Sequence, residues 1–552
     1  MSAPQPAGPP GEPDVIRANS LLFTCALCLL WILLGLIGHD PWKPDEASSF
    51  GLVYHILQTG DWIVPTIAHE PFLEKPPVYY LTAALFAKIF GGVLPLHDAA
   101  RLVSGFYMAL TFLLVGLTSR ELHGEGKGWL GVLALLGSFG LLLPAHYVVA
   151  DVAELTGFAL ALYGIAVCTR RPVLGGLALG SGIGLAFLCK GMLALGAMSI
   201  TVAVLPLLST QWRTRNVVFA VLVALAAALP WILIWPWLLY KHSPALFQEW
   251  FKLDSFGSLL GQNKLGPSIQ PGYYVYQLIW FAFPVLPLAA WAVWQGRKEI
   301  LAQPGLLLPL TVFLATLALL SVSRISREVY AMPMLAPLAI LAVPGVLTLK
   351  RGAANAFWWF ATVFATFMAL IGWFYWMGAD LGFPPRLHRH LMRMQPGYVP
   401  GFDLFKFAVG LALTFFWIWV LVRLKRTPER PLVAHAVGIT LIWGLGLTLF
   451  MAYADTGKSY RPMVMDIARS LPPGYRCLSA RNLGDPQRAM LEYFAGIVTY
   501  RDEIPSRRRR CDFLLVQGLR TSIQQPEAGW TRIWEGARLG DNKELFQLYR
   551  RG

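Results

Sequence analysis

The chain has 552 residues, of which 56% are hydrophobic and only 14% are charged. Soluble domains are about one quarter charged, so this composition excludes an ordinary soluble protein and indicates a protein that crosses a membrane several times. The net charge of +15 does not indicate a nucleic-acid partner. Many of the Lys and Arg residues lie in short loops between apolar runs, where basic residues set membrane topology.

In chain order, residues 1–18 are rich in Pro and Gly, which predicts a disordered cytoplasmic segment. The run NSLLFTCALCLLWILLGLIG follows. It is long and lacks a small-residue cleavage site, so we expect a retained helix. Similar apolar runs, long enough to cross ~30 Å of hydrocarbon, recur as far as residue 453. Thirteen spans are predicted, at 19–38, 102–119, 129–148, 154–168, 173–189, 191–208, 216–238, 273–295, 304–322, 330–348, 356–376, 404–423 and 431–453.

The loops between these spans form two sets that differ in charge. One set is short and basic, for example TRRP, QGRKE and RLKRTPER, which predicts the cytoplasmic side. The other set, from the loop at Asp45 to the C-terminal tail, then faces outward. Whether residues 78–96 cross the membrane decides on which side all the later loops lie. We interpret residues 78–96 as an amphipathic helix at the membrane interface, with Lys88 reaching the surface. The alternative is that they cross the membrane and that a second span has been missed, which would leave the sides of the later loops unchanged.

The apolar runs stop after residue 453, so residues 454–552 are predicted to form a small outward-facing α/β domain. YRCLSA and CDFLLVQG are typical of strands, and DPQRAMLEYFAG of a helix. Cys477 and Cys511 each begin a strand in an oxidising compartment, which indicates a disulfide; two buried free thiols are the alternative. We interpret the arginines at 507–510 as a solvated or headgroup-facing loop, with contact to a phosphate-rich acceptor as the second interpretation.

Several charged residues gather on the outward face although they are far apart in sequence. Their cations can bind a lipid-linked phosphate and stabilise it as a leaving group. A carboxylate can deprotonate or orient an acceptor, or help to hold a divalent ion. Helix capping, interfacial salt bridges and snorkelling are the structural alternatives. The candidates are Asp45 and Glu46 at a helix start, Glu74 and Lys75 before Pro-Pro, Asp151, Lys190, Arg324 and Arg327.

Tyrosines and histidines also lie on this face. Tyr79, Tyr80 and Tyr330 could stack on a sugar or hydrogen-bond to it, although interfacial tyrosines are commonly belt residues. Four histidines face outward or nearly so, but no pair has ligand spacing on one helix. The metal site therefore stays unassigned, with Asp45 and His69 as its candidates. The four histidines are His39, His55, His69 and His146.

The outward-facing motifs resemble those of the GT-C glycosyltransferases of the protein O-mannosyltransferase superfamily, glycosyltransferase families 39 and 83. The likeness is greatest to the bacterial aminoarabinose transferases of lipid A. The motifs occur in the family's order over roughly residues 20–340. They are PDE at 44–46, GDWIVP at 60–65, EKP at 74–76, Asp151, KGMLAL at 190–195, LPW at 229–231, YYV at 273–275 and SVSRISREVYAMP at 321–333.

The resemblance implies a GT-C transmembrane domain at 19–453 and a periplasmic α/β domain at 454–552. It implies an undecaprenyl-phosphate-sugar donor, a lipid A acceptor and inverting transfer at the periplasmic face of the inner membrane. The residues matching Asp45 and Asp151 are essential in the family, and those matching Glu74 and Lys75 lie at the donor phosphate. Some members use a divalent ion such as Zn, Mg or Mn. No organic cofactor is expected, and we expect a monomer in contact with membrane lipids.

Two departures limit what the resemblance carries over. The family's last motif reads Lys-Gly-Lys-Leu-Pro, whereas residues 324–328 read RISRE here. The loop at 254–272 lacks the family's His and Arg and carries Asn263 and Lys264 instead. The fold and the donor therefore carry over better than the sugar, the acceptor or the metal.

The expected mechanism places Lys75, Lys190 and either Arg324 or Arg327 on the donor phosphate. Asp45 then acts as general base for a hydroxyl acceptor, or orients an acceptor that is already ionised or binds a metal. A protein hydroxyl or a polysaccharide is the alternative acceptor. A transporter of lipid-linked substrates is the alternative from another class, but it predicts repeated halves that are not found in the sequence.

Overall fold

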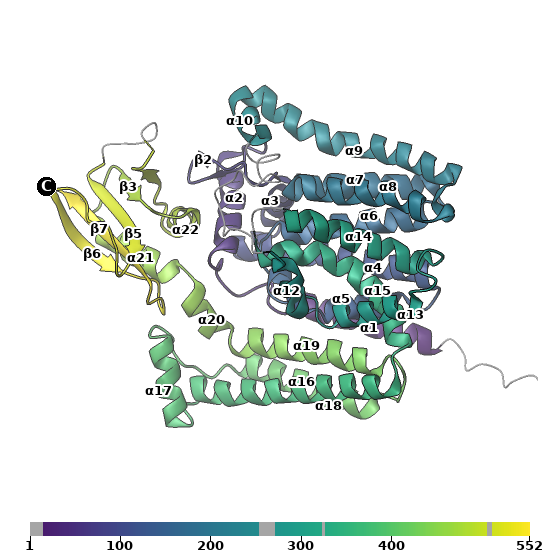
Figure 1. Ribbon diagram of the computed structural model, residues 1–552. Coiled ribbons are helices and arrows are strands. Elements are labelled where there is room, and N and C mark those ends of the chain that lie inside the picture. Colours follow the sequence, from purple (N-terminus) through teal and green to yellow (C-terminus); the bar gives the residue numbers. More distant parts are fainter. Residues whose placement is uncertain (1–14, 253–270, 323–325, 505–510) are drawn as a thin grey trace, which may run out of the picture.

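The computed structural model describes residues 15–252, 271–322, 326–504 and 511–552. Most of its helices run side by side in one bundle (Figure 1). The C-terminal domain, helix α2 (Asp45–Thr59) and strand β2 (Glu70–Pro71) lie at one end of this bundle, and helix α1 (Val15–Leu33) begins at the other. The loops and short helices at the first end build the candidate site.

Long apolar helices make up the bundle because a helix satisfies its own backbone hydrogen bonds in hydrocarbon. By length and composition, eight described helices can cross a membrane, and two bent pairs raise the number to ten. The eight are α4 (Leu96–His123), α7 (Pro172–Lys190), α9 (Arg215–His242), α14 (Pro304–Val322), η5 (Glu328–Met334) continued by α15 (Leu335–Leu347), α16 (Arg351–Asp380), α18 (Leu404–Arg423) and α19 (Arg430–Leu449). The chain is therefore a multi-pass membrane protein.

The two bent pairs correspond to predicted spans that the structure breaks. One pair turns by 65° and the other by 104°. The first consists of α5 (Gly128–Leu136) with η1 (Phe139–Leu141) and η2 (Pro144–His146), and the second of α12 (Tyr273–Phe281) with α13 (Val285–Gly296). Pro284 lies at the second break, where a proline removes a helical hydrogen bond.

The remaining three predicted spans are also helices, but the length and composition test does not place them among the ten. They are α1 (Val15–Leu33), α6 (Asp151–Val167) and α8 (Met192–Leu208). Every predicted span therefore coincides with a helix or a bent pair in the described residues, while the number thirteen stays a prediction.

Short elements connect the bundle helices. Helix α3 covers only 13 residues, fewer than the ~20 that a span needs, so its length fits the predicted interfacial helix. The short elements are α2 (Asp45–Thr59), β1 (Thr66–Ile67), β2 (Glu70–Pro71), α3 (Val78–Phe90), η3 (Thr210–Trp212), α10 (Pro244–Glu249) and α17 (Pro385–Met394).

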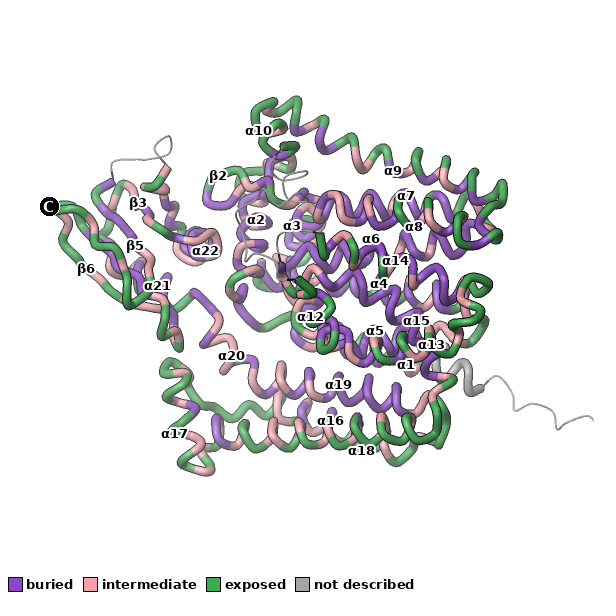
Figure 2. Tube along the Cα trace, viewed as in Figure 1, coloured by how far each residue is buried: buried purple, intermediate pink, exposed green. Residues whose placement is uncertain are grey.

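Burial divides the bundle into an interior and a periphery (Figure 2). Helices α6, α7 and α15 are mostly buried, whereas α9, α16 and α18 expose apolar side chains such as Leu225 and Trp359. Helices α6 and α7 approach closely through glycine, since a Cβ on Gly164 would lie 2.4 Å from the backbone N of Leu179.

The C-terminal domain is a mixed five-stranded sheet in the order β4-β3-β5-β7-β6. Strand β3 pairs in parallel with β4 and β5, and β7 pairs antiparallel with β5 and β6. The predicted strands and helix correspond to β3, β5 and α22. The elements are α20 (Met451–Lys458), α21 (Arg461–Ser470), β3 (Leu478–Arg481), α22 (Asp485–Ala495), β4 (Thr499–Arg501), β5 (Phe513–Leu519), β6 (Trp530–Gly536) and β7 (Glu544–Arg551).

The two cysteines of this domain, Cys477 and Cys511, are joined by a disulfide, with a Cα–Cα distance of 5.2 Å. Cys477 directly precedes β3, and Cys511 lies two residues before the start of the neighbouring strand β5. The arginines at 507–510 lie outside the described residues, so their predicted role stays a prediction.

Candidate active site

A cavity of about 110 Å³ lies where α2 begins, at the end of the bundle that carries the C-terminal domain. It combines acidic and basic side chains from distant parts of the chain. Five of the predicted site residues line it, namely Asp45, Glu46, Lys75, Asp151 and Arg327. The other lining residues are Lys43, Pro44, Pro144, Tyr147, Val149 and Val329.

Asp45 is held by a charge-assisted hydrogen bond at the start of α2. The Nη2 atom of Arg327 donates to its Oδ1 atom at 2.6 Å. Both side chains keep part of their surface exposed, 41% for Asp45 and 36% for Arg327. The Asp45 carboxylate is therefore oriented by a cation while staying accessible from the cavity.

Lys75 is half-buried in the extended segment before α3. Burial alone would lower its pKa, but Tyr80, Asp151, Tyr330 and Asp45 raise the pKa above its usual value. Lys75 is therefore positively charged at neutral pH, as a ligand for phosphate must be.

Asp151 and Lys190 are brought together by the close packing of α6 against α7. Lys190 Nζ donates to Asp151 Oδ1 and lies 3.9 Å from Glu154 Oε2. The same ammonium group lies 3.6 Å from the centroid of the Tyr330 ring. Asp151 lines the cavity and Lys190 is not among its lining residues, so in the described structure Lys190 contacts the cavity through Asp151.

The three predicted tyrosines lie in different surroundings. Tyr79 is fully buried and its hydroxyl pairs with Ser104 Oγ at 2.7 Å. Tyr80 is also buried and its hydroxyl pairs with Ser49. Neither lines the described cavity, because both hydroxyls are used to pack α3 against its neighbours. Tyr330 contacts the site through Lys190.

The other predicted residues lie elsewhere. Glu74 is exposed and is not among the residues lining the described cavity. Arg324 lies outside the described residues, as do Asn263 and Lys264 of the divergent loop.

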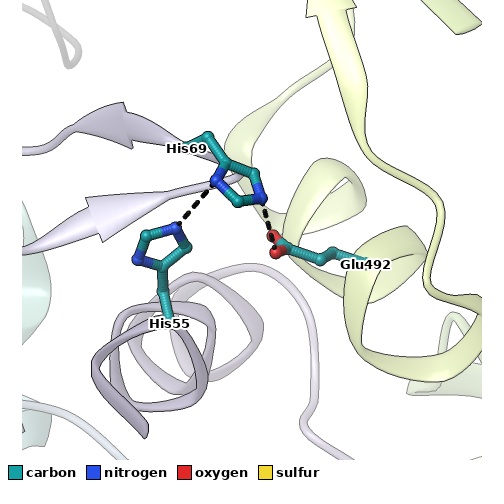
Figure 3. A group of neighbouring side chains, drawn as sticks. All are labelled: His55, His69 and Glu492. Carbon is teal, nitrogen blue, oxygen red and sulfur yellow. Dashed lines mark hydrogen bonds and ion pairs between the residues drawn. The ribbon is translucent and has the colours of Figure 1, made fainter. Parts of the chain in front are cut away.

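The two metal candidates have different surroundings. Asp45 lies beside the Arg327 guanidinium, and Lys43 and Lys75 line the same cavity. A divalent ion requires several oxygen or nitrogen ligands, and this cationic setting does not fit one within the described residues. His69 instead lies with His55 and Glu492 (Figure 3), a group that could hold a metal ion.

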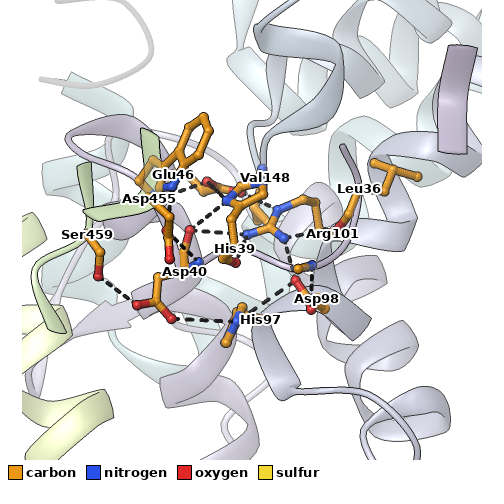
Figure 4. A network of polar contacts seen from close by, with 12 residues as sticks. Leu36, His39, Asp40, Glu46, His97, Asp98, Arg101, Val148, Asp455 and Ser459 are labelled. Atoms are coloured by element: carbon orange, nitrogen blue, oxygen red, sulfur yellow. Dashed lines mark hydrogen bonds and ion pairs between the residues drawn. The ribbon is translucent and has the colours of Figure 1, made fainter. Parts of the chain in front are cut away.

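Behind the cavity, Glu46 belongs to a buried polar network (Figure 4). Its Oε1 atom accepts hydrogen bonds from Arg101 Nε at 2.6 Å and from the Val148 N–H at 3.2 Å. Its Oε2 atom accepts the Trp42 N–H at 2.9 Å. Both oxygens of Glu46 are therefore engaged in holding the loop that precedes α2.

Arg101 is the centre of this network and was missed by the sequence analysis. It is fully buried, pairs with Asp98 Oδ1 at 2.6 Å, and donates to the backbone carbonyls of Leu36 and His39, each at 3.1 Å. A charged residue at the edge of an apolar helix was the available signal, since such residues need partners.

The network extends to the C-terminal domain. The carboxylate of Asp40 accepts from Ser459 Oγ at 2.7 Å and also pairs with Arg461. Lys43, on the cavity wall, donates to Asp541 Oδ2 at 3.0 Å. The cavity loop is thus fastened to the C-terminal domain by charged contacts.

Asp455, which accepts hydrogen bonds from the loop before α2, makes the stability of the folded protein depend on pH. Burial and the nearby Asp40 raise the pKa of Asp455 to about 6, above the value of about 4 for a free Asp. The folded state therefore binds the proton more tightly, and this group lowers stability as pH rises from about 4 to 6. Asp455→Asn is expected to stabilise the protein by about 1–3 kcal/mol at pH 7.5 and to have no effect near pH 4.

Thermal unfolding in detergent at the two pH values measures this difference. Asp455 Oδ1 accepts the Asp40 N–H at 3.0 Å and Trp42 Nε1–H at 2.8 Å, and the amide oxygen of Asn can accept both. A variant that is less stable than the wild type at both pH values would contradict the prediction.

With this geometry in place, comparison with known proteins identifies related chains. Residues 74–235 match the family model described as dolichyl-phosphate-mannose-protein mannosyltransferase. Undecaprenyl phosphate-alpha-4-amino-4-deoxy-L-arabinose arabinosyl transferase 2 of Pseudomonas fluorescens is 29% identical over 330 residues, 56% of this chain and 53% of the relative. The arabinosyl transferase of Pseudomonas aeruginosa is 30% identical over 339 residues, 58% of each chain. The matches thus span little more than half of these relatives.

Two crystal structures of ArnT from Cupriavidus metallidurans match almost the whole chain. The apo form gives a TM-score of 0.70 over 97% of this chain, and the form bound to undecaprenyl phosphate gives 0.68 over 96%. Both matches cover 98% of the ArnT chain at 16% identity, which shows a shared fold. The chain therefore has the fold of these ArnT structures, a bundle of membrane helices with a C-terminal α/β domain. The predicted resemblance to the bacterial aminoarabinose transferases is confirmed.

Proposed function

We propose that the chain is an inner-membrane glycosyltransferase that uses an undecaprenyl-phosphate-linked sugar. The acceptor is a phosphate of lipid A, the sugar is 4-amino-4-deoxy-L-arabinose, and transfer inverts the anomeric centre. The observation that carries the proposal is the cavity that combines Asp45 and Asp151 with Lys75 and Arg327. The names of the related arabinosyl transferases support the donor and the sugar.

The site lies at the periplasmic face under this proposal. The cavity and the C-terminal domain share one end of the bundle, and helix α1 begins at the other (Figure 1). The basic loops predict a cytoplasmic N-terminus. The polyprenyl tail of the donor stays in the outer leaflet, and its phosphate reaches the cavity from the membrane.

Cations of the cavity hold the donor phosphate. Lys75 and Arg327 line the cavity directly and stabilise the negative charge that grows on the phosphate as it leaves. Lys190 acts on Asp151, which it contacts, and so positions that carboxylate rather than the phosphate. Asp45 faces the acceptor, deprotonating a hydroxyl or orienting a phosphate that is already ionised. Glu46 is a positioning residue because both its oxygens hold the loop.

A different acceptor is the second candidate. The sequence at 324–328 departs from the family's last motif, and Arg327 from this segment lines the cavity. This departure favours a different sugar or acceptor, such as a protein hydroxyl or a polysaccharide, with unchanged donor chemistry.

Mass spectrometry of lipid A from cells with and without the protein tests the proposal. A mass increase that matches one aminopentose on a lipid A phosphate is the expected result. Unchanged lipid A together with accumulation of a polyprenyl-phosphate sugar in the deletion strain would move the acceptor to protein or polysaccharide. No change in either pool would contradict a glycosyltransferase function.

Lys75→Ala is expected to weaken donor binding by about 10- to 100-fold, because a hydrogen bond to a charged group contributes about 1.5–3 kcal/mol. Binding of undecaprenyl phosphate to the purified protein measures the effect. Lys88→Ala is the matched control, since Lys88 is exposed at the end of α3 and is not among the residues that line the cavity. Equal affinities of the Lys75 and Lys88 variants would contradict the phosphate assignment.

A further inference from the structure

Three side chains from distant parts of the chain meet outside the catalytic cavity (Figure 3). They are His55 on α2, His69 in the turn between β1 and β2, and Glu492 on α22. His55 Nε2 lies 3.4 Å from His69 Nδ1, and His69 Nε2 lies 3.3 Å from Glu492 Oε1. One ligand atom from each residue can be chosen so that all three lie within 4.8 Å of one another.

We propose that His55, His69 and Glu492 bind a zinc ion that joins the C-terminal domain to the helix and hairpin at the membrane surface. Two imidazoles and one carboxylate are a donor set that zinc takes, with a water as fourth ligand. Ligand atoms about 2.0–2.2 Å from a tetrahedral zinc lie about 3.3–3.6 Å apart. The two short distances involve different ring nitrogens of His69, and with one nitrogen of His69 the three ligand atoms lie within 4.8 Å of one another. The exposed His69 ring therefore has to rotate before all three residues can bind one ion.

The surroundings of His55 are those of a metal ligand. Its Nδ1 atom is hydrogen-bonded to the hydroxyl of Thr66 on β1. A proton on Nδ1, donated to Thr66, leaves the lone pair of Nε2 directed toward His69 and available to a metal. Such a hydrogen bond to the second ring nitrogen fixes the tautomer and orientation of metal-binding histidines.

The backbone at His69 supports the same conclusion. The hairpin turn consists of Ala68 and His69, with φ of 47° and 62°. Turns with two residues in the left-handed region prefer Asn and Gly, and non-glycine residues there cost about 1–3 kcal/mol each. A bound metal offsets this cost by holding the His69 ring against Glu492, whereas a turn without such a role would favour glycine.

Helix α22 is already fixed where Glu492 can reach the histidines. Arg488, one turn earlier on α22, donates to Glu70 Oε1 on β2 at 2.8 Å. A Cβ on Gly51 of α2 would lie 2.4 Å from the Cβ of Ala489, so the two helices touch. His55 lies ten residues after Asp45, about 15 Å along α2. The zinc therefore has a structural role separate from the reacting groups.

Metal analysis of the full-length protein in detergent tests the proposal. After incubation with zinc chloride and desalting, the wild type is expected to retain about one zinc per chain. His55→Ala, His69→Ala and Glu492→Gln are expected to lose it. The control is His390→Ala, because His390 is exposed on α17 away from the cluster. Thr66→Val keeps all three ligands and is expected to weaken zinc binding by about 10- to 100-fold.

A second measurement reports the coordination of the metal directly and so distinguishes lost ligands from poor folding of a variant. Cobalt replaces zinc and gives visible absorption bands when its coordination is tetrahedral, so the wild type is expected to show the bands and Glu492→Gln to lose them. Zinc is also expected to raise the unfolding temperature of the wild type only, since it binds the folded state. Two results would contradict the proposal: no zinc retained by the wild type, or equal zinc retained by the wild type and the three ligand variants. The cluster would then consist only of polar contacts among the three side chains. None of these measurements depends on transferase activity.

Discussion

Replacing Asp45 with Asn is expected to reduce the transfer rate by about 100-fold, because a misplacement of the acceptor by about 1 Å can cost that much. The carboxylate opens α2 on the wall of the cavity and is oriented by Arg327 at 2.6 Å. Asn keeps the size of the side chain but can neither take a proton nor carry the charge that balances Arg327. Initial rates with the purified protein, a polyprenyl-phosphate sugar and lipid A measure the effect.

The control for this variant is Asp466→Asn. Asp466 is an exposed carboxylate on α21 whose partner is Arg469 within the same helix, so its loss is expected to leave the rate unchanged. Equal unfolding temperatures of the two variants would exclude misfolding as the cause of a lost rate. Full activity of Asp45→Asn would make the catalytic assignment wrong.

The cavity could be predicted from sequence because topology restricts where charged residues can lie. Asp45, Lys75, Asp151 and Arg327 are separated by up to 282 positions. All four lie next to ends of apolar runs, and the alternation of basic loops places those ends on one side of the membrane. The motifs PDE and EKP supported the functional interpretation, and the structure brings all of PDE and Lys75 of EKP to the same cavity.

Side-chain direction could not be predicted in the same way. Asp45 and Glu46 are neighbours, but successive residues of a helix point about 100° apart. One therefore stays partly exposed beside Arg327 and the other is fully buried against Arg101. Tyr79 and Tyr80 were interpreted as pocket residues, but their hydroxyls pack α3. These outcomes depend on which helix lies opposite, and no spacing along one segment reports it.

Contacts between the transmembrane bundle and the C-terminal domain could not be predicted from sequence either. Asp40 meets Arg461, and His69 meets Glu492, across more than 400 positions. The spacing of histidines along one helix cannot reveal a cluster built from a helix, a turn and another domain. The bends in the spans at 129–148 and 273–295 had a local signal, since Gly137-Ser138 and Pro284 lie at the two breaks.

Replacing Arg101 with Met is expected to destabilise the protein by about 3–5 kcal/mol, because it leaves buried carboxylates without their partner. Arg101 is fully buried and pairs with both Glu46 and Asp98 at 2.6 Å. The control is Arg469→Met, which removes an exposed pair within one helix and is expected to cost less than about 1 kcal/mol. Unfolding in detergent, followed by a probe of helix content, measures both variants.

A double-mutant cycle separates the Glu46–Arg101 contact from other effects of the substitution. Because Arg101 Nε contacts Glu46 Oε1 at 2.6 Å, Glu46→Gln combined with Arg101→Met is expected to cost less than the sum of the single changes. The remaining cost reports the loss of the Arg101 contact with Asp98. Additive costs would show that the two side chains are not coupled. The burial of Glu46 would then rest on the Trp42 and Val148 N–H groups alone.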